Sequence, residues 1–199
     1  MLILSLDTAT DAASCALVRD GDVLGERRSR SARILADAHE LLEHAAMAPR
    51  ELDAIAVGTG PGSYTGLRMG LAAARALSLS LDLPVAGVST LVALAAGASD
   101  ALPVIDARRG EVFTLIGGEP RVLRPEEVPV DAGMLCVGDG AVRYRALFER
   151  AGGEVPDDSS DAHVPWARFH AALATEFGPA ELAAPVYLRV PDAERALQR

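Results

Sequence analysis

A glycine-rich segment constrains this chain more than any other feature of its sequence. It runs Gly60-Pro61-Gly62-Ser63-Tyr64-Thr65-Gly66, between a buried-strand pattern at 52–58 and a helical pattern at 66–81 that is apolar on most faces. A glycine-rich turn between a strand and a helix presents backbone N–H groups at the positive end of the helix dipole. The segment therefore predicts an α/β fold and a candidate nucleotide or anion site at Gly60, Gly62, Ser63 and Thr65.

The same segment also suits a tight strand-to-helix connection in which the hydroxyl of Ser63 or Thr65 caps the helix. It lacks the spacing and the lysine of a P-loop, and all 19 basic residues of the chain are arginine. Its third glycine is out of place for a dinucleotide-binding fingerprint. Both interpretations of the loop stay open at this point.

The charge balance argues against nucleic-acid binding by the chain alone. Its formal net charge is −9, and binding to phosphate backbones depends on cationic side chains.

The N-terminal stretch has no basic region and reaches Asp7 too early for a signal peptide, and no apolar run approaches membrane-spanning length. We therefore expect a cytoplasmic protein without membrane contact, with Cys15 and Cys136 as buried thiols.

An apolar strand that ends in an aspartate, followed by a turn and a second strand, occurs twice, at Asp7 and again at Asp106. We interpret this as a weak internal duplication, with a first lobe at 1–98 that carries the glycine loop and a smaller, degenerate second lobe at 99–199. Residues 117–133 are rich in proline, glycine and charge, and no strand or helix is predicted there. The predicted strands are 2–7, 13–19, 22–28, 52–58, 85–88, 103–106, 111–116 and 134–137, and the predicted helices are 31–47, 66–81, 89–96, 141–151 and 164–177.

The two strand-end aspartates are candidate ligands for a hydrated magnesium ion. Asp7, next to Thr8, could hold a Mg²⁺ water beside a phosphate, and Asp106 could do the same from the second lobe. The alternative is that each aspartate caps its own turn, which is the favoured interpretation for Asp106 taken alone.

The histidines do not suggest a metalloprotease. His39 and His44 are five residues apart, so they lie about 140° apart around a helix, whereas H-E-x-x-H places both histidines on one face. His163 and His170 are expected at the surface. The histidines thus indicate no metal site, and no residue of the chain is predicted to be catalytic.

Two helical segments carry broad apolar stripes that we interpret as a partner interface, with an ordinary core as the alternative. Alanine-rich faces allow another helix pair to approach closely. The predicted interface residues are Ile34, Leu35, Ala38 and Leu42 on the first helix, and Arg68, Leu71 and Arg75 on the second. A self-complementary face of this kind also predicts a homodimer when the chain is alone.

Five segments of the chain, taken together and in their order along it, resemble the bacterial TsaB (YeaZ) family. The resemblance is dense over roughly the first 115 residues and then thin until the C-terminal segment Pro185 to Arg189. It implies an actin-like ATPase (ASKHA) fold, with two related lobes of mixed sheets flanked by helices and a reduced second lobe. The segments are Ile3 to Thr10, Gly60 to Gly70, Gly87-Val88-Ser89-Thr90-Leu91, Ile105 to Phe113 and Pro185-Val186-Tyr187-Leu188-Arg189.

The resemblance also implies a role in threonylcarbamoyladenosine modification of tRNA. It implies a TsaD-type catalytic partner and a TsaE-type ATPase, tRNA contacted only through the complex, and ATP and Mg²⁺ used by the complex without tight binding to this chain. TsaD carries two metal-binding histidines, and the matching positions here are Thr90 and Leu94, so the chain is expected to be non-catalytic. Arg30 departs from the family, which often has a histidine there. The alternative function is a small ATP-binding phosphotransferase or acyltransferase of the same fold.

Overall fold

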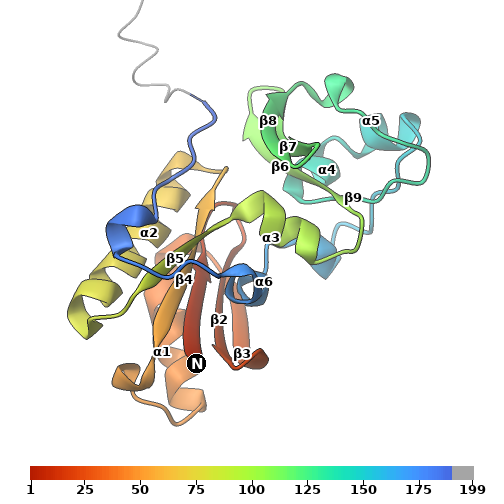
Figure 1. Ribbon diagram of the computed structural model, residues 1–199. Helices are drawn as coiled ribbons and strands as arrows, with labels where there is room; N and C mark the ends of the chain where they lie inside the picture. Colours follow the sequence, from red (N-terminus) through yellow and green to blue (C-terminus); the bar gives the residue numbers. More distant parts are fainter. Residues whose placement is uncertain (190–199) are drawn as a thin grey trace, which may run out of the picture.

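The N-terminal apolar stretch forms the central strand of a five-stranded sheet in the computed structural model, which describes residues 1–189 (Figure 1). Strand β1 (Leu2–Asp7) pairs antiparallel with β2 (Ala13–Arg19), which pairs with β3 (Asp22–Ser29). On its other side β1 pairs parallel with β4 (Ala54–Gly60), and β4 with β5 (Val85–Ser89). Strands β1 and β4 are buried along their whole length, which explains their continuous apolar sequences.

The second sheet repeats the first in shortened form. Its order is β8-β7-β6-β9, against β3-β2-β1-β4-β5 in the first sheet, with the same antiparallel pairs followed by a parallel strand. This confirms the predicted duplication and the reduced second lobe. The strands are β6 (Leu102–Arg108), β7 (Glu111–Ile116), β8 (Glu119–Leu123) and the two-residue β9 (Cys136–Val137). Strand β8 falls within 117–133, where no strand or helix was predicted from the sequence.

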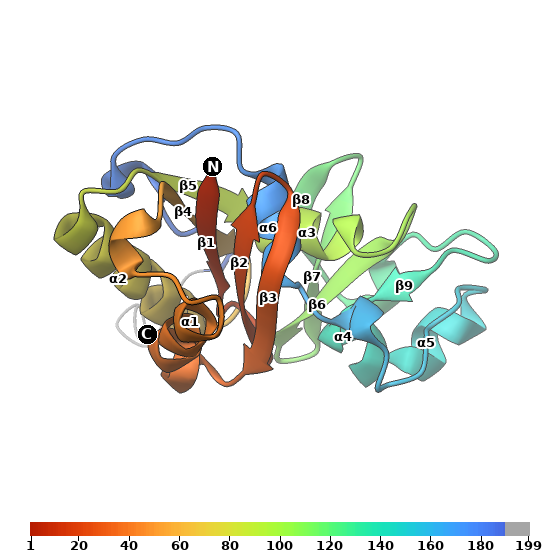
Figure 2. The same ribbon diagram turned by 90° about the horizontal axis from the view of Figure 1, so that it is seen from below.

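Helices cover both faces of the first sheet (Figure 2). On one face, α1 (Ile34–His44) packs on the even-numbered leucines of β1, and α2 (Tyr64–Leu81) packs on β4 and β5. On the opposite face α6 (Ala167–Leu173) packs against Ile3, Ala16 and Ala56, and α3 (Thr90–Ala96) lies beside it. Strand alternation thus gives each sheet face its own helical layer.

Helices of the second lobe are short. The predicted helix 141–151 is interrupted at Tyr144, which separates α4 (Asp139–Arg143) from α5 (Arg145–Arg150). Within residues 1–189, no helix combines the length and apolarity needed to cross a membrane. Single 3₁₀ turns occur at Ser31–Arg33, Pro49–Glu51, Pro125–Glu127, Asp161–His163 and Ala180–Leu182.

The chain returns to the first lobe after the second, which the predicted boundaries 1–98 and 99–199 do not allow for. Helix α6 lies on β1 and β2, and residue Gly178 bridges Val85 at the edge of the first sheet. The segment 178–189, which we call the strap, then runs beside α2, and the N–H of Val186 donates to the carbonyl of Thr59 at 2.8 Å (Figure 1). Residues 164–187 therefore pack mainly on the first lobe, whereas Leu188 packs with Ile105 and Phe113, and Arg189 donates to the carbonyl of Ala107. Residues 190–199 of the predicted second lobe lie outside the described residues.

Candidate functional site between the lobes

A cleft of about 270 Å³ lies between the glycine loop of the first lobe and the β6–β7 hairpin of the second. Four of the predicted site residues line it, namely Gly62, Ser63, Thr65 and Asp106. The strap closes one side of the cleft with Tyr187 and Arg189. The predicted site is thus partly assembled, by elements that are far apart in the sequence.

Asp7 and Thr8 do not face this cleft, which corrects the expectation that they hold a hydrated magnesium ion. Asp7 is 0% exposed, and its two oxygens have partners within the chain. Oδ1 accepts the N–H of Ala9 at 2.9 Å, and Oδ2 accepts the hydroxyl of Thr90 at 2.8 Å and lies 3.0 Å from Nε2 of His170. Thr8 is also buried, and its hydroxyl donates to the carbonyl of Gly66 at 2.7 Å.

The glycine loop uses several of its own amides for internal contacts. The N–H of Gly60 donates to Oγ1 of Thr90 at 3.2 Å, and the N–H of Ser63 donates to the carbonyl of Ala9 at 2.7 Å. Ser63 caps α2 by accepting the N–H of Gly66 at 3.3 Å. Gly60 therefore lies under the loop surface, and the capping interpretation holds for Ser63. Gly62, Ser63 and Thr65 are the predicted loop residues that face the cleft.

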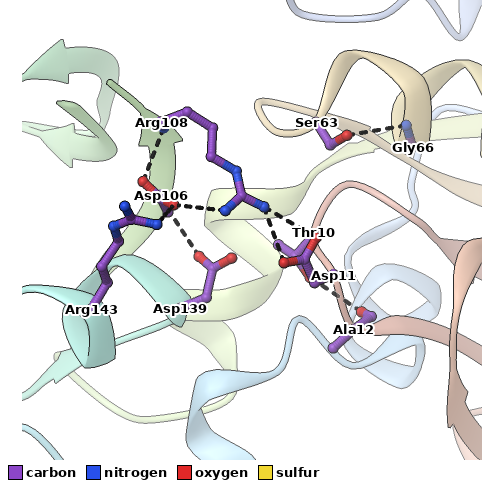
Figure 3. A network of polar contacts seen from close by, with 9 residues as sticks. All are labelled: Thr10, Asp11, Ala12, Ser63, Gly66, Asp106, Arg108, Asp139 and Arg143. Carbon is purple, nitrogen blue, oxygen red and sulfur yellow. Dashed lines mark hydrogen bonds and ion pairs between the residues drawn. The ribbon is translucent and has the colours of Figure 1, made fainter. Parts of the chain in front are cut away.

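Asp106 is held by arginines, as Figure 3 shows. Its Oδ1 accepts the N–H of Arg108 at 2.9 Å, and its Oδ2 accepts from the guanidinium groups of Arg108 at 3.2 Å and Arg143 at 3.1 Å. The carboxylate thus caps its own turn and is neutralised by two cations. This corrects the expectation that Asp106 holds a Mg²⁺ water.

Arg108 also joins the two lobes, because its Nη2 donates to both oxygens of Asp11 at 3.0 and 3.2 Å (Figure 3). Asp139 completes the cluster by accepting the N–H of Asp106 at 2.9 Å. Burial raises the pKa of Asp139, and the negative charges of Asp106 and Asp11 add to that rise. None of Arg108, Arg143, Asp11 and Asp139 was predicted as a site residue, since only the turn at 108–110 marks this region in the sequence.

His163 and His170 are buried, so the prediction that both lie at the surface is wrong. His163 accepts the N–H of Gly138 at its Nδ1 (3.0 Å), and its Nε2 lies 3.1 Å from the carbonyl of Pro156. His170 is 0% exposed. The spacing of His170 with Ala167 and Ala171 is the helical signal that places it on the buried face. Within residues 1–189, no three or more His, Cys, Asp or Glu side chains are grouped as metal ligands.

The predicted interface residues divide into buried and exposed sets. Ile34, Ala38, Leu42 and Leu71 are at most 5% exposed and pack on the chain's own first sheet, so they cannot contact a partner. Leu35 is 50% exposed, and Arg68 and Arg75 lie on the outer side of α2. The outer side of α2 also carries an exposed apolar stripe that was not predicted, formed by Met69, Ala72, Ala76 and Leu79.

Comparison with known proteins identifies a protein family that this chain resembles. Residues 26–126 match the family model described as TsaD, tRNA N6-adenosine threonylcarbamoyltransferase. A Bacillus subtilis protein named tRNA threonylcarbamoyladenosine biosynthesis protein TsaB is 42% identical over 68% of this chain and 63% of its own length. The chain thus spans less than two thirds of that relative.

Two further comparisons cover nearly the whole chain. An uncharacterised protein of Mycobacterium tuberculosis is 38% identical over 96% of this chain and 93% of its own length. The structure of YeaZ from Pseudomonas aeruginosa superposes with a TM-score of 0.75 and 34% identity, over 94% of this chain and 99% of that chain. The predicted actin-like α/β fold with two related lobes is thereby confirmed.

Proposed function

The chain belongs to the TsaB (YeaZ) family, and on that premise we propose that it is a non-catalytic subunit in the threonylcarbamoyladenosine modification of tRNA. It acts by heterodimerising with a TsaD-type catalytic subunit and activating it. The observation that carries the non-catalytic role is the state of Asp7. Its carboxylate is fully buried and engaged by Thr90 and His170, which leaves it unable to ligate a hydrated metal ion at the cleft.

The positions that match the metal-binding histidines of TsaD support the same proposal. Thr90 is 0% exposed and uses its hydroxyl to contact Asp7 and the N–H of Gly60. Leu94 is 1% exposed and packs in the core with Ile105 and Phe113. These two residues are therefore part of the internal framework of this chain.

The exposed stripe on α2 is the proposed contact with the TsaD-type subunit. Its members, Met69, Ala72, Ala76 and Leu79, are spaced three and four residues apart, so they share one helix face. Leu79 is 88% exposed, and the two alanines leave room for another helix to approach closely. The same stripe would support a homodimer when the catalytic subunit is absent.

Other components follow from the family. A TsaE-type ATPase completes the complex, ATP and Mg²⁺ are used by the complex, and tRNA is contacted through it in the cytoplasm. The net charge of −9 supports an indirect contact with tRNA, because phosphate binding needs cationic surface.

Reconstitution of the modification from purified subunits tests this proposal. Leu79→Arg places a charge in the stripe, and Leu24→Arg is the matched control, since Leu24 is 42% exposed on β3 and remote from α2. We expect Leu79→Arg to abolish complex formation and modification, and Leu24→Arg to leave both intact. Full activity of the Leu79→Arg chain would contradict the interface.

A small ATP-binding phosphotransferase or acyltransferase is the second candidate, because the cleft brings Thr65 at the start of α2 close to the arginine-rich β6–β7 hairpin. Calorimetry with Mg-ATP on the isolated chain separates the two functions. Binding heat that is lost in Arg108→Ala would favour the enzyme, and no heat at millimolar ligand would remove it.

A further inference from the structure

The buried carboxylate of Asp7 joins three parts of the first lobe that are distant in sequence. Oδ1 accepts the N–H of Ala9 in the turn after β1. Oδ2 accepts the hydroxyl of Thr90 at the start of α3 and lies 3.0 Å from Nε2 of His170 on α6. All three side chains, Asp7, Thr90 and His170, are 0% exposed.

Both ends of the glycine loop are linked to this carboxylate by hydrogen bonds through one intermediate residue. At one end, the hydroxyl that Thr90 donates to Asp7 also accepts the N–H of Gly60. At the other end, Ala9 donates its N–H to Asp7 and accepts the N–H of Ser63 through its carbonyl. Ser63 in turn caps α2 through the N–H of Gly66. A continuous chain of hydrogen bonds thus runs from Asp7 to the first turn of α2.

The backbone packs closely around Asp7 and the glycine loop, with no space for an additional methyl group at Gly58 or Gly62. A Cβ at Gly58 would lie 1.8 Å from Oδ2 of Asp7 and 3.2 Å from Nε2 of His170. A Cβ at Gly62 would lie 2.3 Å from the carbonyl oxygen of Ala9. The carboxylate and the loop are therefore fixed by contact as well as by hydrogen bonds.

Nε2 of His170 lies 3.0 Å from Oδ2 of Asp7, within ion-pair distance, and makes no hydrogen bond within residues 1–189. A carboxylate removed from water needs a compensating partner, and removal of that partner leaves an uncompensated charge in the interior. Helix α6 brings the histidine to Asp7 by packing Ala167 and Ala171 on the outer face of β1 and β2. The segment that returns from the second lobe thereby completes the support of the glycine loop.

We propose that His170, Asp7 and Thr90 form a positioning relay, through which docking of α6 fixes the glycine loop and the first turn of α2. None of the three touches a partner or a substrate. The structural part of this proposal is independent of the proposed function. Only its second part, that the position of α2 determines the affinity for a TsaD-type subunit, rests on the proposed function.

Two substitutions of Thr90 that differ in one group test the relay. Thr90→Val keeps the branched shape and removes the hydroxyl, whereas Thr90→Ser keeps the hydroxyl. Thr59→Val is the matched control, because the Thr59 hydroxyl donates to the carbonyl of Val88 at 3.1 Å, outside the relay. Native-state hydrogen exchange is followed at the amides of Gly60, Ser63 and Gly66.

We expect Thr90→Val to speed exchange of these amides about tenfold, the effect of losing one buried hydrogen bond, while the other two variants stay within about threefold. In His170→Gly the same amides should exchange faster, and added imidazole should restore their protection, which a purely structural loss would not allow. The Thr90 pair decides the outcome if the glycine variant does not fold. Equal exchange in Thr90→Val and Thr90→Ser, or acceleration spread evenly over the first sheet, would overturn the relay.

Affinity for a TsaD-type subunit is measured on the same variants. We expect Thr90→Val to weaken it and Thr90→Ser to preserve it. Unchanged affinity in a variant whose loop exchanges faster would overturn the positioning role. A wild-type chain that does not bind the subunit would contradict the proposed function. The relay would then be tested by the hydrogen-exchange measurement alone.

Discussion

Asp106 makes the same turn contact as Asp7: each Oδ1 accepts, at 2.9 Å, the N–H of the residue two positions later in the chain. The two aspartates end equivalent central strands, β1 and β6, of sheets with the same pairing order. Their second oxygens are treated differently. Oδ2 of Asp7 meets Thr90 and His170, whereas Oδ2 of Asp106 meets Arg108 and Arg143. Both lobes thus keep the same aspartate-to-backbone turn contact, but different side chains surround the second carboxylate oxygen in each lobe.

Gly58→Ala should destabilise the fold by about 3 kcal/mol, since the new methyl group overlaps Asp7 and pushes a buried carboxylate off its partners. Denaturant unfolding measures the loss. Gly178→Ala is the control, because its Cβ would meet only the mobile end of the exposed Leu182 side chain, at 3.3 Å. An effect no larger than in the control would contradict the tight packing around Asp7.

The sequence predicted the framework better than the site. The strand-end aspartates, the capping serine Ser63 and the eight predicted strands follow from local patterns, and these are confirmed, whereas β8 was not predicted. What Asp7 and Asp106 contact depends on residues more than thirty positions away, such as Thr90 and Arg143. Local spacing carries no information on such pairs. An apolar helical stripe likewise cannot tell whether it faces a partner or the chain's own sheet, as Leu71 illustrates.

Asp139→Asn should stabilise the protein at neutral pH. Burial raises the pKa of Asp139 in the folded state, so the folded chain holds this proton more tightly than the unfolded chain. The wild type therefore has its full stability below the unfolded pKa of about 3.9 and loses part of it as pH rises through the folded pKa. Asparagine keeps an acceptor for the N–H of Asp106 and has no charge to bury.

The expected result is a variant that matches the wild type near pH 3 and exceeds it increasingly toward pH 7. Melting temperatures across that range measure the difference. A difference that is constant with pH would show that Asp139 does not titrate in the folded state as inferred.

Arg108→Gly should be more stable than Arg108→Ala by about 1 kcal/mol. Both variants lose the contacts with Asp11 and Asp106, and they differ in the backbone, because residue 108 has φ of 64°. Glycine adopts this left-handed conformation without the steric cost that a Cβ brings. Urea unfolding of the two variants isolates that cost, and equal stabilities would argue against strain at the hairpin.

Cys15 and Cys136 should resist thiol reagents as long as the chain is folded. Both side chains are 0% exposed, and burial raises the pKa of Cys136 to about 11 and that of Cys15 still further. The reactive species is the thiolate, so labelling requires opening of the structure. Labelling rates measured across a denaturant series should track global unfolding, and rapid modification of either thiol in buffer would contradict its burial.

Leu71 and Leu79 differ in burial on α2, so truncation of each should have a different effect. Leu71 is 4% exposed and packs on Ile55 and Val57, so Leu71→Ala should cost about 3 kcal/mol of unfolding free energy. Leu79 is 88% exposed, so Leu79→Ala should change stability by less than about 0.5 kcal/mol. Under the proposed interface, the stable Leu79→Ala chain is the one that loses affinity for a TsaD-type subunit. Wild-type affinity together with unchanged stability in Leu79→Ala would leave this side of α2 without a function in assembly.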